Sequence, residues 1–172
     1  RRYFTPGNGV GVFEVEGVRV GLLICEDAWF EEPARLARDA GAQVLAVLNA
    51  SPFHAGKGPE REQRMRERVA DSGLPLVYAH LVGGQDEVIF EGCSFALNAQ
   101  GETVARAEGF READLAVQAS LGQQGVDLSA EPQALVPMAS ADAELWDALV
   151  LGVRDYLGKN GFKGAILGLS GG

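Results

Sequence analysis

An apolar run leads directly to a cysteine in Val18-Arg-Val-Gly-Leu-Leu-Ile-Cys-Glu-Asp-Ala-Trp29. This run, Val18–Ile24, is almost entirely apolar, which is typical of a strand buried on both faces of a sheet. Glu16-Gly17 separates this strand from a partly alternating run at Val10–Val15, so we expect the two runs to form a hairpin. The strand ends at Cys25, where the backbone must turn toward the next helix.

Helical and strand patterns alternate after this turn. Apolar residues have helical spacing over Pro33–Ala40, and a second helix is predicted at Glu60–Asp71 after a loop at 51–59. The further strands are predicted at Val44–Leu48, Leu76–Val82, Val88–Asn98, Thr103–Ala107 and Leu115–Ala119. Strands that alternate with helices and are followed by a run of strands predict an α/β fold, a mixed sheet with helices outside it.

The last third of the sequence begins with residues that show no regular spacing of apolar side chains. Gly and Pro interrupt residues 123–140, which we expect to be a linker. A helical stripe returns at Asp142–Lys159, and Gly164–Leu169 is predicted to be a strand that leads into a Ser-Gly-Gly turn. Small residues after a strand let backbone N–H groups face an anion, so this turn is a candidate phosphate loop. An ordinary Gly-rich strand end is the alternative.

Composition excludes several classes of protein. With 172 residues, 47% hydrophobic and 23% charged, the chain fits a soluble globular protein with one substantial core. A net charge of −9 argues against a nucleic-acid surface, and the basic residues in 60–68 alternate with acidic ones, as on a solvated helix face. The apolar runs are too short to span a membrane. The presence of only two cysteines favours a reducing compartment, by default the cytoplasm.

Cys25 is the residue most suggestive of chemistry. A thiol at the end of a buried strand lies where nearby N–H groups are free to bind an oxyanion, although Glu26 and Asp27 disfavour a thiolate there. The alternative is a buried structural thiol. Cys93 is expected to pack in the middle of a strand.

The other candidate side chains are weaker. His54 and His80 have no acid or cysteine at a metal-binding spacing, so no metal site is predicted. Asp86, Glu87 and Glu91 are expected to be exposed hairpin charges.

Taken together, six motifs resemble the glutamine-dependent NAD synthetase family. They are Cys25-Glu-Asp-Ala-Trp29, Asn49-Ala-Ser-Pro-Phe53, Val82-Gly-Gly-Gln-Asp-Glu87, Gly92-Cys-Ser-Phe95, Arg154-Asp-Tyr156 with Lys159-Asn-Gly-Phe-Lys-Gly164, and Leu167-Gly-Leu-Ser-Gly-Gly172. The resemblance implies the C-terminal part of a nitrilase-like α-β-β-α sandwich at 1–122, a linker at 123–141, and at 142–172 the first helix and strand of an ATP-dependent nucleotide-binding domain. The sequence is then expected to be an internal piece of a longer protein.

The resemblance also implies a reaction. A Glu-Lys-Cys triad hydrolyses glutamine, and the ammonia passes to a domain that uses ATP and magnesium to amidate deamido-NAD. No permanently bound cofactor or metal is implied. The enzyme would be a cytoplasmic homo-oligomer, and the alternatives are another nitrilase-type carbon-nitrogen hydrolase or an inert nitrilase-fold scaffold.

Each site residue follows from its motif. Cys25 matches the nucleophile and the Glu26 backbone N–H an oxyanion donor, while Ser51 and Lys57 match glutamine-binding positions. The triad Glu and Lys are expected upstream of Arg1, so the isolated 172-residue chain is expected to be inactive. The ATP-binding positions are Gly168, Leu169, Ser170, Gly171 and Gly172.

Overall fold

A six-stranded mixed sheet forms the centre of the protein. The computed structural model describes residues 5, 7, 9–123 and 125–171. In sheet order the strands are β1 (Gly11–Val15), β2 (Val18–Ile24), β3 (Val44–Asn49), β4 (Leu76–His80), β7 (Phe95–Leu97) and β8 (Thr103–Arg106). The pairs β2/β3 and β3/β4 are parallel and the other pairs are antiparallel. The predicted α/β class and mixed sheet are therefore confirmed.

Glu16 and Gly17 form the turn of the predicted β1–β2 hairpin. Both have positive φ, 48° and 82°, which matches the right-handed twist of two-residue hairpins. The hairpin leaves Val15 opposite Val18 and Leu22 opposite Gly11. The turn thus sets the register in which β2 enters the sheet.

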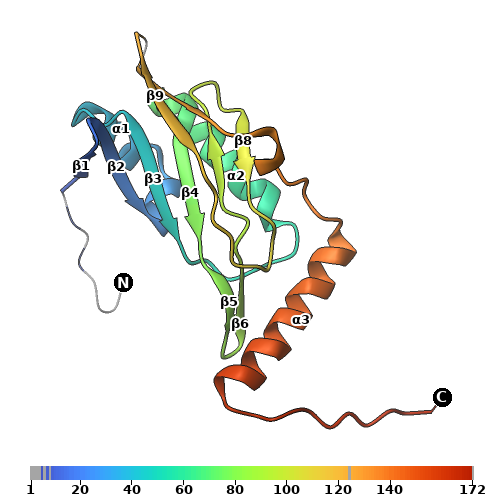
Figure 1. The fold of residues 1–172 in the computed structure, drawn as a ribbon. Coiled ribbons are helices and arrows are strands. Elements are labelled where there is room, and N and C mark those ends of the chain that lie inside the picture. The colour runs from blue at the N-terminus through green and yellow to red at the C-terminus, as the bar shows by residue number, and fades with distance from the viewer. Residues whose placement is uncertain (1–4, 6, 8, 124, 172) are drawn as a thin grey trace.

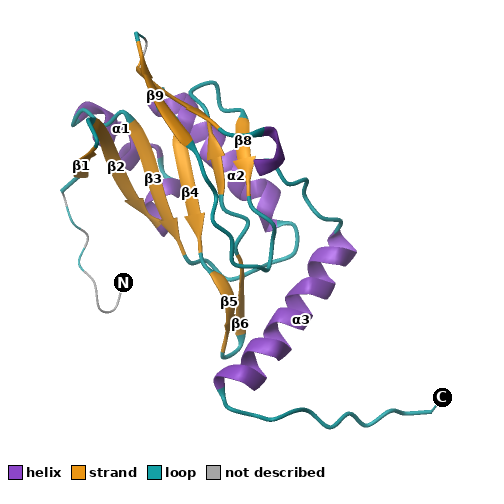
Figure 2. Cartoon of the chain, in the orientation of Figure 1, coloured by secondary structure: helices purple, strands orange, loops and turns teal. Residues whose placement is uncertain are grey.

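Two helices, α1 (Glu31–Asp39) and α2 (Lys57–Ser72), cover one face of the sheet. Figure 2 shows them behind the strands, with β9 in front. They bury Ala34 and Ala37 of α1 and Met65 and Val69 of α2 against the sheet. Helix α2 begins earlier than predicted, so Lys57 lies in its first turn, where Pro59 is tolerated because the N–H of a first-turn residue has no partner within the helix.

The other face of the sheet is covered by a ribbon of β9 (Gln118–Gly122) and β10 (Gly125–Ser129). Val126 and Leu128 are buried there with Val44, Ala96 and Ala105. The expectation that residues 123–140 lack regular structure is therefore wrong for β10 and for the short 3-10 helix η2 (Pro132–Ala134). Two alternating apolar residues were too few to predict a strand. The division into domains stays a prediction.

The predicted strand Val88–Asn98 is divided. Its first part, β6 (Val88–Glu91), pairs with β5 (Val82–Gln85) in a separate ribbon, whereas β7 joins the main sheet. The break comes at Gly92 and Cys93, whose φ values are 69° and 54°. Cys93 therefore lies in a turn and not in the middle of a strand, since this conformation cannot continue a strand.

Helix α3 (Ala141–Lys159) packs against the β5–β6 ribbon, and the Ser140 hydroxyl caps it by accepting from the Ala143 N–H at 3.3 Å. Figure 1 shows the helix alongside this ribbon. Two side chains attach the helix to one glycine: the Gly84 N–H donates to Asp155 at 2.8 Å, and the Lys159 ammonium donates to the Gly84 carbonyl oxygen.

The predicted strand Gly164–Leu169 is absent from the structure. The described residues 162–171 form neither helix nor strand, and Ile166, Leu167 and Leu169 are almost fully exposed. A strand needs a neighbour that accepts and donates its backbone hydrogen bonds, and no described segment pairs with these residues. Among the described residues, no helix is both long enough and apolar enough to cross a membrane.

Gly21 provides a test of this packing. A Cβ added there would lie 2.9 Å from the Cβ atoms of Ala37 and Ala42, closer than real side chains approach. Gly21→Ala should therefore lower the free energy of unfolding by about 1–3 kcal/mol. The measurement is urea unfolding of the full-length protein followed by far-UV circular dichroism.

The matched control is Gly11→Ala on the neighbouring strand, where an added Cβ meets only Leu22 at 3.5 Å, an ordinary contact. The control should change stability by less than about 0.5 kcal/mol. Equal effects of the two substitutions would contradict the described contact between β2 and α1.

Candidate functional site

Cys25 lies at the carboxyl end of β2, as predicted, and is the first residue of the 3-10 helix η1 (Cys25–Trp29). Its φ of +48° is unusual for a residue with a side chain. The Asp27 carboxylate stabilises the turn by accepting from the Ile24 N–H at 2.9 Å. A sharp turn from strand to helix exposes the first side chain above the sheet edge, the geometry of nucleophile elbows.

Ser51 approaches the sulfur from the neighbouring strand. Because β2 and β3 are parallel, with Ile24 opposite Leu48, their carboxyl ends meet at the same edge. The Cys25 Sγ and Ser51 Oγ atoms are 3.6 Å apart. The Ser51 hydroxyl donates to the Asn49 side-chain oxygen at 3.1 Å, so its oxygen is held toward the sulfur.

An open pocket of about 520 Å³ lies over this pair. Its lining comprises Cys25, Glu26, Trp29, Phe30, Ser51, Pro52, His54, Lys57 and Arg61. The structure thus brings the four residues predicted for glutamine chemistry to one pocket, while their roles stay predictions. The volume lies in the range of small-molecule sites. The sequence reasoning missed the aromatic residues and Arg61.

Lys57 presents its ammonium group at the rim. The Nζ atom lies 4.9 Å from the centre of the Trp29 ring and donates to Glu60 at 2.7 Å. This hydrogen bond lowers the pKa of the Glu60 carboxyl. The carboxylate holds the ammonium from the solvent side, and the indole face holds it from the pocket side.

Buried charges lie directly behind the pocket. Arg61 and Glu91 are 3% and 4% exposed and form an ion pair. The Arg61 guanidinium also donates to the Pro52 carbonyl oxygen at 3.1 Å. The expectation of a solvated helix face at 60–68 is therefore wrong at Arg61, Glu62 and Arg68, and Glu91 is not an exposed hairpin charge. The missed signal was the helical spacing that places Arg61 and Arg68 on one face with Met65 and Val69.

His80 completes this buried group. Its Nδ1 atom lies 3.2 Å from the Asn49 carbonyl oxygen, and its Nε2 atom lies 3.5 Å from the Glu91 carboxylate. Burial, together with the charge of Arg61, lowers the pKa of His80 to about 4. The ring is therefore neutral at physiological pH, and the short Nδ1 contact assigns its proton to Nδ1.

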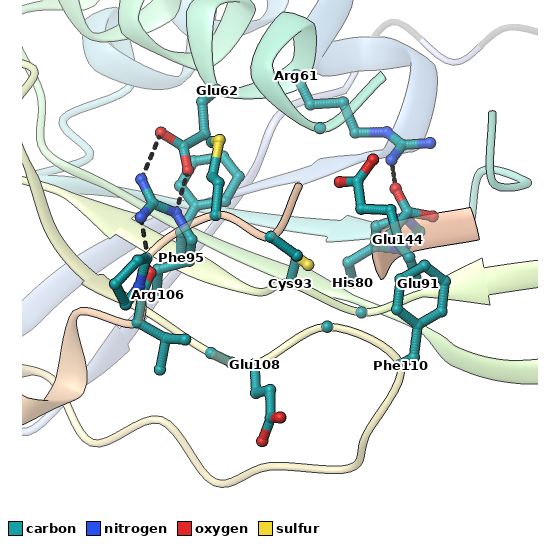
Figure 3. A pocket seen from close by; sticks show the side chains of 18 of the residues that line it. Arg61, Glu62, His80, Glu91, Cys93, Phe95, Arg106, Glu108, Phe110 and Glu144 are labelled. Atoms are coloured by element: carbon teal, nitrogen blue, oxygen red, sulfur yellow. Dashed lines mark hydrogen bonds and ion pairs between the residues drawn. The ribbon is translucent and has the colours of Figure 1, made fainter. Parts of the chain in front are cut away.

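A second, less open cavity of about 180 Å³ lies beyond Arg61 (Figure 3). Cys93 and Glu144 line it, as does an ion pair in which Arg106 Nε lies 2.6 Å from the Glu62 carboxylate. Burial, reinforced by Glu144, raises the pKa of the Cys93 thiol to about 11. This thiol is therefore protonated and unreactive at neutral pH, in keeping with its predicted structural role.

The predicted phosphate loop lies apart from both cavities. Gly168, Leu169, Ser170 and Gly171 belong to the exposed C-terminal segment, and Gly172 lies outside the described residues. Their predicted role in ATP binding stays a prediction. Within the described part of the chain, no group of three or more His, Cys, Asp or Glu side chains has the arrangement of a metal site.

Comparison with known sequences places this geometry in context. Residues 1–125 match the carbon-nitrogen hydrolase family. A glutamine-dependent NAD(+) synthetase from Xanthomonas campestris pv. campestris is 41% identical over 176 residues, which cover 100% of this chain and 31% of the relative. The corresponding protein of Thermotoga maritima is 31% identical, with 100% of this chain and 35% of the relative covered. The chain thus spans about a third of the length of these curated relatives.

Two solved structures are similar in fold. A glutamine-dependent NAD+ synthetase from Acinetobacter baumannii, solved in complex with ADP, has a TM-score of 0.88 and 36% identity, and the match covers 99% of this chain and 32% of that one. A carbon-nitrogen hydrolase from Helicobacter pylori has a TM-score of 0.58 and 23% identity, with 89% and 51% covered. The second likeness concerns the fold alone.

The neutral state of His80 predicts a loss of stability in acid. An unfolded histidine binds a proton below a pH of about 6.5, whereas folded His80 does so only below about 4. Above pH 6.5 the neutral ring makes its full contribution to the free energy of unfolding. As the pH falls toward 4, this contribution decreases by up to about 3 kcal/mol. His80→Asn removes this titration.

Hydrogen exchange of strand β4, measured by mass spectrometry on the full-length protein, tests this expectation. The exchange rate of the natural protein divided by that of His80→Asn should rise steadily as the pH is lowered from 6.5 to 4.5. This range lies within the window set by the pKa of an unfolded histidine and that of folded His80. Taking the ratio at each pH removes the intrinsic pH dependence of exchange. A ratio that stays constant across this range would show that residue 80 does not titrate as described.

Proposed function

Because the chain belongs to the carbon-nitrogen hydrolase family, we propose that it carries the nucleophile of a glutamine-hydrolysing site and that Cys25 is this nucleophile. The observation that carries the proposal is the contact of 3.6 Å between the Cys25 sulfur and Ser51 at the floor of an open pocket. The positive φ at Cys25 supports it further, since strained conformations cluster at active sites.

In the proposed reaction, the Cys25 sulfur attacks the side-chain carbonyl carbon of glutamine. A C–S bond forms, and the carbonyl oxygen becomes an oxyanion that accepts from the Glu26 backbone N–H. Collapse of this intermediate breaks the C–N bond, and ammonia leaves after receiving a proton. Water then cleaves the thioester, which gives glutamate and restores the thiol. The Glu of the family's triad takes the proton of the Cys25 thiol and passes it to the leaving nitrogen, and the Lys of the triad is a second oxyanion donor.

Ser51 and Lys57 are proposed to hold the amino-acid end of glutamine. The two groups line one pocket and suit a small zwitterion, because the Lys57 ammonium can donate a charge-assisted hydrogen bond to its carboxylate and the Ser51 oxygen can accept one from its ammonium group. Trp29 and Phe30 would then exclude water from the bound side chain.

The activity of the whole protein is inferred from its relatives. The curated relatives named glutamine-dependent NAD(+) synthetases align with all or nearly all of this chain, including residues 142–172. We infer that the ammonia amidates deamido-NAD in an ATP- and magnesium-dependent reaction, with Gly168–Gly172 at the ATP phosphates. The complex of the Acinetobacter baumannii protein with ADP supports nucleotide binding by the complete protein. The complete protein is proposed to be a cytoplasmic homo-oligomer.

Replacement of the nucleophile tests the proposal directly. In the full-length protein, Cys25→Ala should abolish NAD synthesis from glutamine and leave synthesis from added ammonia unchanged within about twofold, because ammonia bypasses the thiol chemistry. Steady-state NAD formation with each nitrogen source is the measurement. Cys93→Ser is the matched control, since this thiol lies outside the Cys25 pocket, and it should retain both activities. Glutamine-driven synthesis in Cys25→Ala would refute the assignment.

Removal of the ammonium group at the rim tests substrate binding. Lys57→Ala should raise the KM for glutamine by about 10–100-fold, the loss expected for one charge-assisted hydrogen bond, without changing ammonia-driven synthesis. Glu60→Gln is the control, because it removes the partner of Lys57 but keeps the ammonium group. If Lys57 only pairs with Glu60, both variants should behave alike, and that result would exclude the binding role.

A further inference from the structure

A closed chain of polar contacts surrounds the base of the Cys25 pocket. It starts at the Cys25 sulfur and ends at Pro52, and it is closed by the peptide bond between Ser51 and Pro52. In order, its members are Cys25, Ser51, Asn49, His80, Glu91, Arg61 and Pro52. Asn49, His80, Glu91 and Arg61 are buried, although three of them are ionisable or charged types that are seldom buried without a specific partner.

We propose that Glu91 is a positioning residue for the Cys25 pocket, acting through Arg61 on the place of the Ser51 hydroxyl. The proposal rests on the proposed function only in naming glutamine as the substrate. The positioning itself concerns the distance between Ser51 and the sulfur and can be measured without any substrate.

The first route runs through Arg61. Its guanidinium donates to the Pro52 carbonyl oxygen at 3.1 Å and thereby fixes the backbone next to Ser51. Arg61 lies at the boundary of the two cavities, and it is held there by the Glu91 carboxylate. A guanidinium that is 3% exposed cannot stay in place without a counter-charge, because an unpaired buried charge is strongly unfavourable.

A second route to Ser51 starts at His80 and includes no hydrogen bond to Glu91, because the Nε2 atom that faces this carboxylate carries no proton. The neutral ring donates from Nδ1 to the Asn49 carbonyl oxygen, and its Nε2 atom lies 3.4 Å from the Asn49 amide nitrogen. This contact turns the Asn49 amide so that its oxygen faces Ser51. Since the Ser51 hydroxyl has a single proton and gives it to Asn49, its lone pairs face Cys25. Both routes therefore converge on one hydroxyl group.

The test uses the full-length protein with Glu91→Gln, which keeps the size of the side chain and removes its charge. We expect kcat for glutamine-driven synthesis to fall about tenfold or more, because the sulfur loses its fixed distance to Ser51. The KM should rise as well, because Ser51 is also proposed to hold the amino-acid end of glutamine. Ammonia-driven synthesis should stay within about twofold of the natural protein, because ammonia bypasses the Cys25 pocket, and far-UV circular dichroism checks that the variant is folded. Glu91→Asp, which keeps the charge, should recover part of the lost kcat.

A second measurement needs no substrate. Iodoacetamide alkylates Cys25, and the rate follows from mass spectrometry of the tryptic peptide 20–35. Alkylation should be slower in Glu91→Gln by a factor similar to the loss of kcat. If Cys25→Ala keeps its glutamine-driven activity, the proposed function fails, but this rate still decides whether Glu91 positions the thiol.

Arg106→Lys is the matched control. It weakens another ion pair of α2, the one between Glu62 of this helix and the partly exposed Arg106 of β8, and it does not touch the Cys25 pocket. The control should leave the alkylation rate unchanged. An unchanged kcat and alkylation rate in Glu91→Gln would overturn the proposal, and so would equal losses in Glu91→Gln and Arg106→Lys, because these would indicate a purely structural effect. Should Glu91→Gln not fold, Glu91→Asp and Arg61→Lys provide the same comparison.

Discussion

The parallel pairing of β2, β3 and β4 is the constraint on which the candidate site depends. Three consecutive strands end at one edge of the sheet, with Ile24 opposite Leu48 and Asn49 opposite His80. This register alone brings the residue after β2, the last residue of β3 and the last residue of β4 together. Ligand sites in such sheets lie outside the carboxyl ends of the strands for the same geometric reason. A shift of one residue in β3 would turn Asn49 to the opposite face and remove the contacts that hold Ser51.

The buried charges behind this edge have an energetic consequence. Burial lowers the pKa of both Arg61 and His80, that is, it disfavours their protonated forms. The ion pair with Glu91 compensates the cost of burying the charge of Arg61. His80, by contrast, is neutral. A buried ion pair of this kind contributes little net stability, since desolvation opposes the attraction between the charges. It is better understood as fixing one arrangement of α2 against the loop at 51–56.

The sequence was sufficient to predict the elements and contacts that depend on apolar patterns and local turns. The runs at β2 and β3 identified two buried strands, and the place of Cys25 and Ser51 just beyond them followed from strand ends alone. The part that could not be predicted depends on tertiary contacts. Helical spacing places Arg61 on the face of Met65 and Val69, but nothing in the sequence marks Glu91 as buried, because it becomes buried only by pairing with Arg61. Strand β10 has two buried apolar residues, which no period distinguishes from a loop.

The attachment of α3 to Gly84 has a consequence for the edge of the β5–β6 ribbon. Strand β5 pairs with β6 on one side, and on its other side the Asp155 carboxylate accepts the Gly84 N–H while the Lys159 ammonium donates to the carbonyl oxygen of the same residue. A glycine at position 84 favours this close approach, because a Cβ there would lie only 3.2 Å from the Asp155 Cβ and 3.3 Å from the Gly152 Cα. Two helix side chains thus occupy the groups that a third strand would use. The ribbon's open edge is thereby closed at this point to pairing with another polypeptide, which protects against edge-to-edge aggregation.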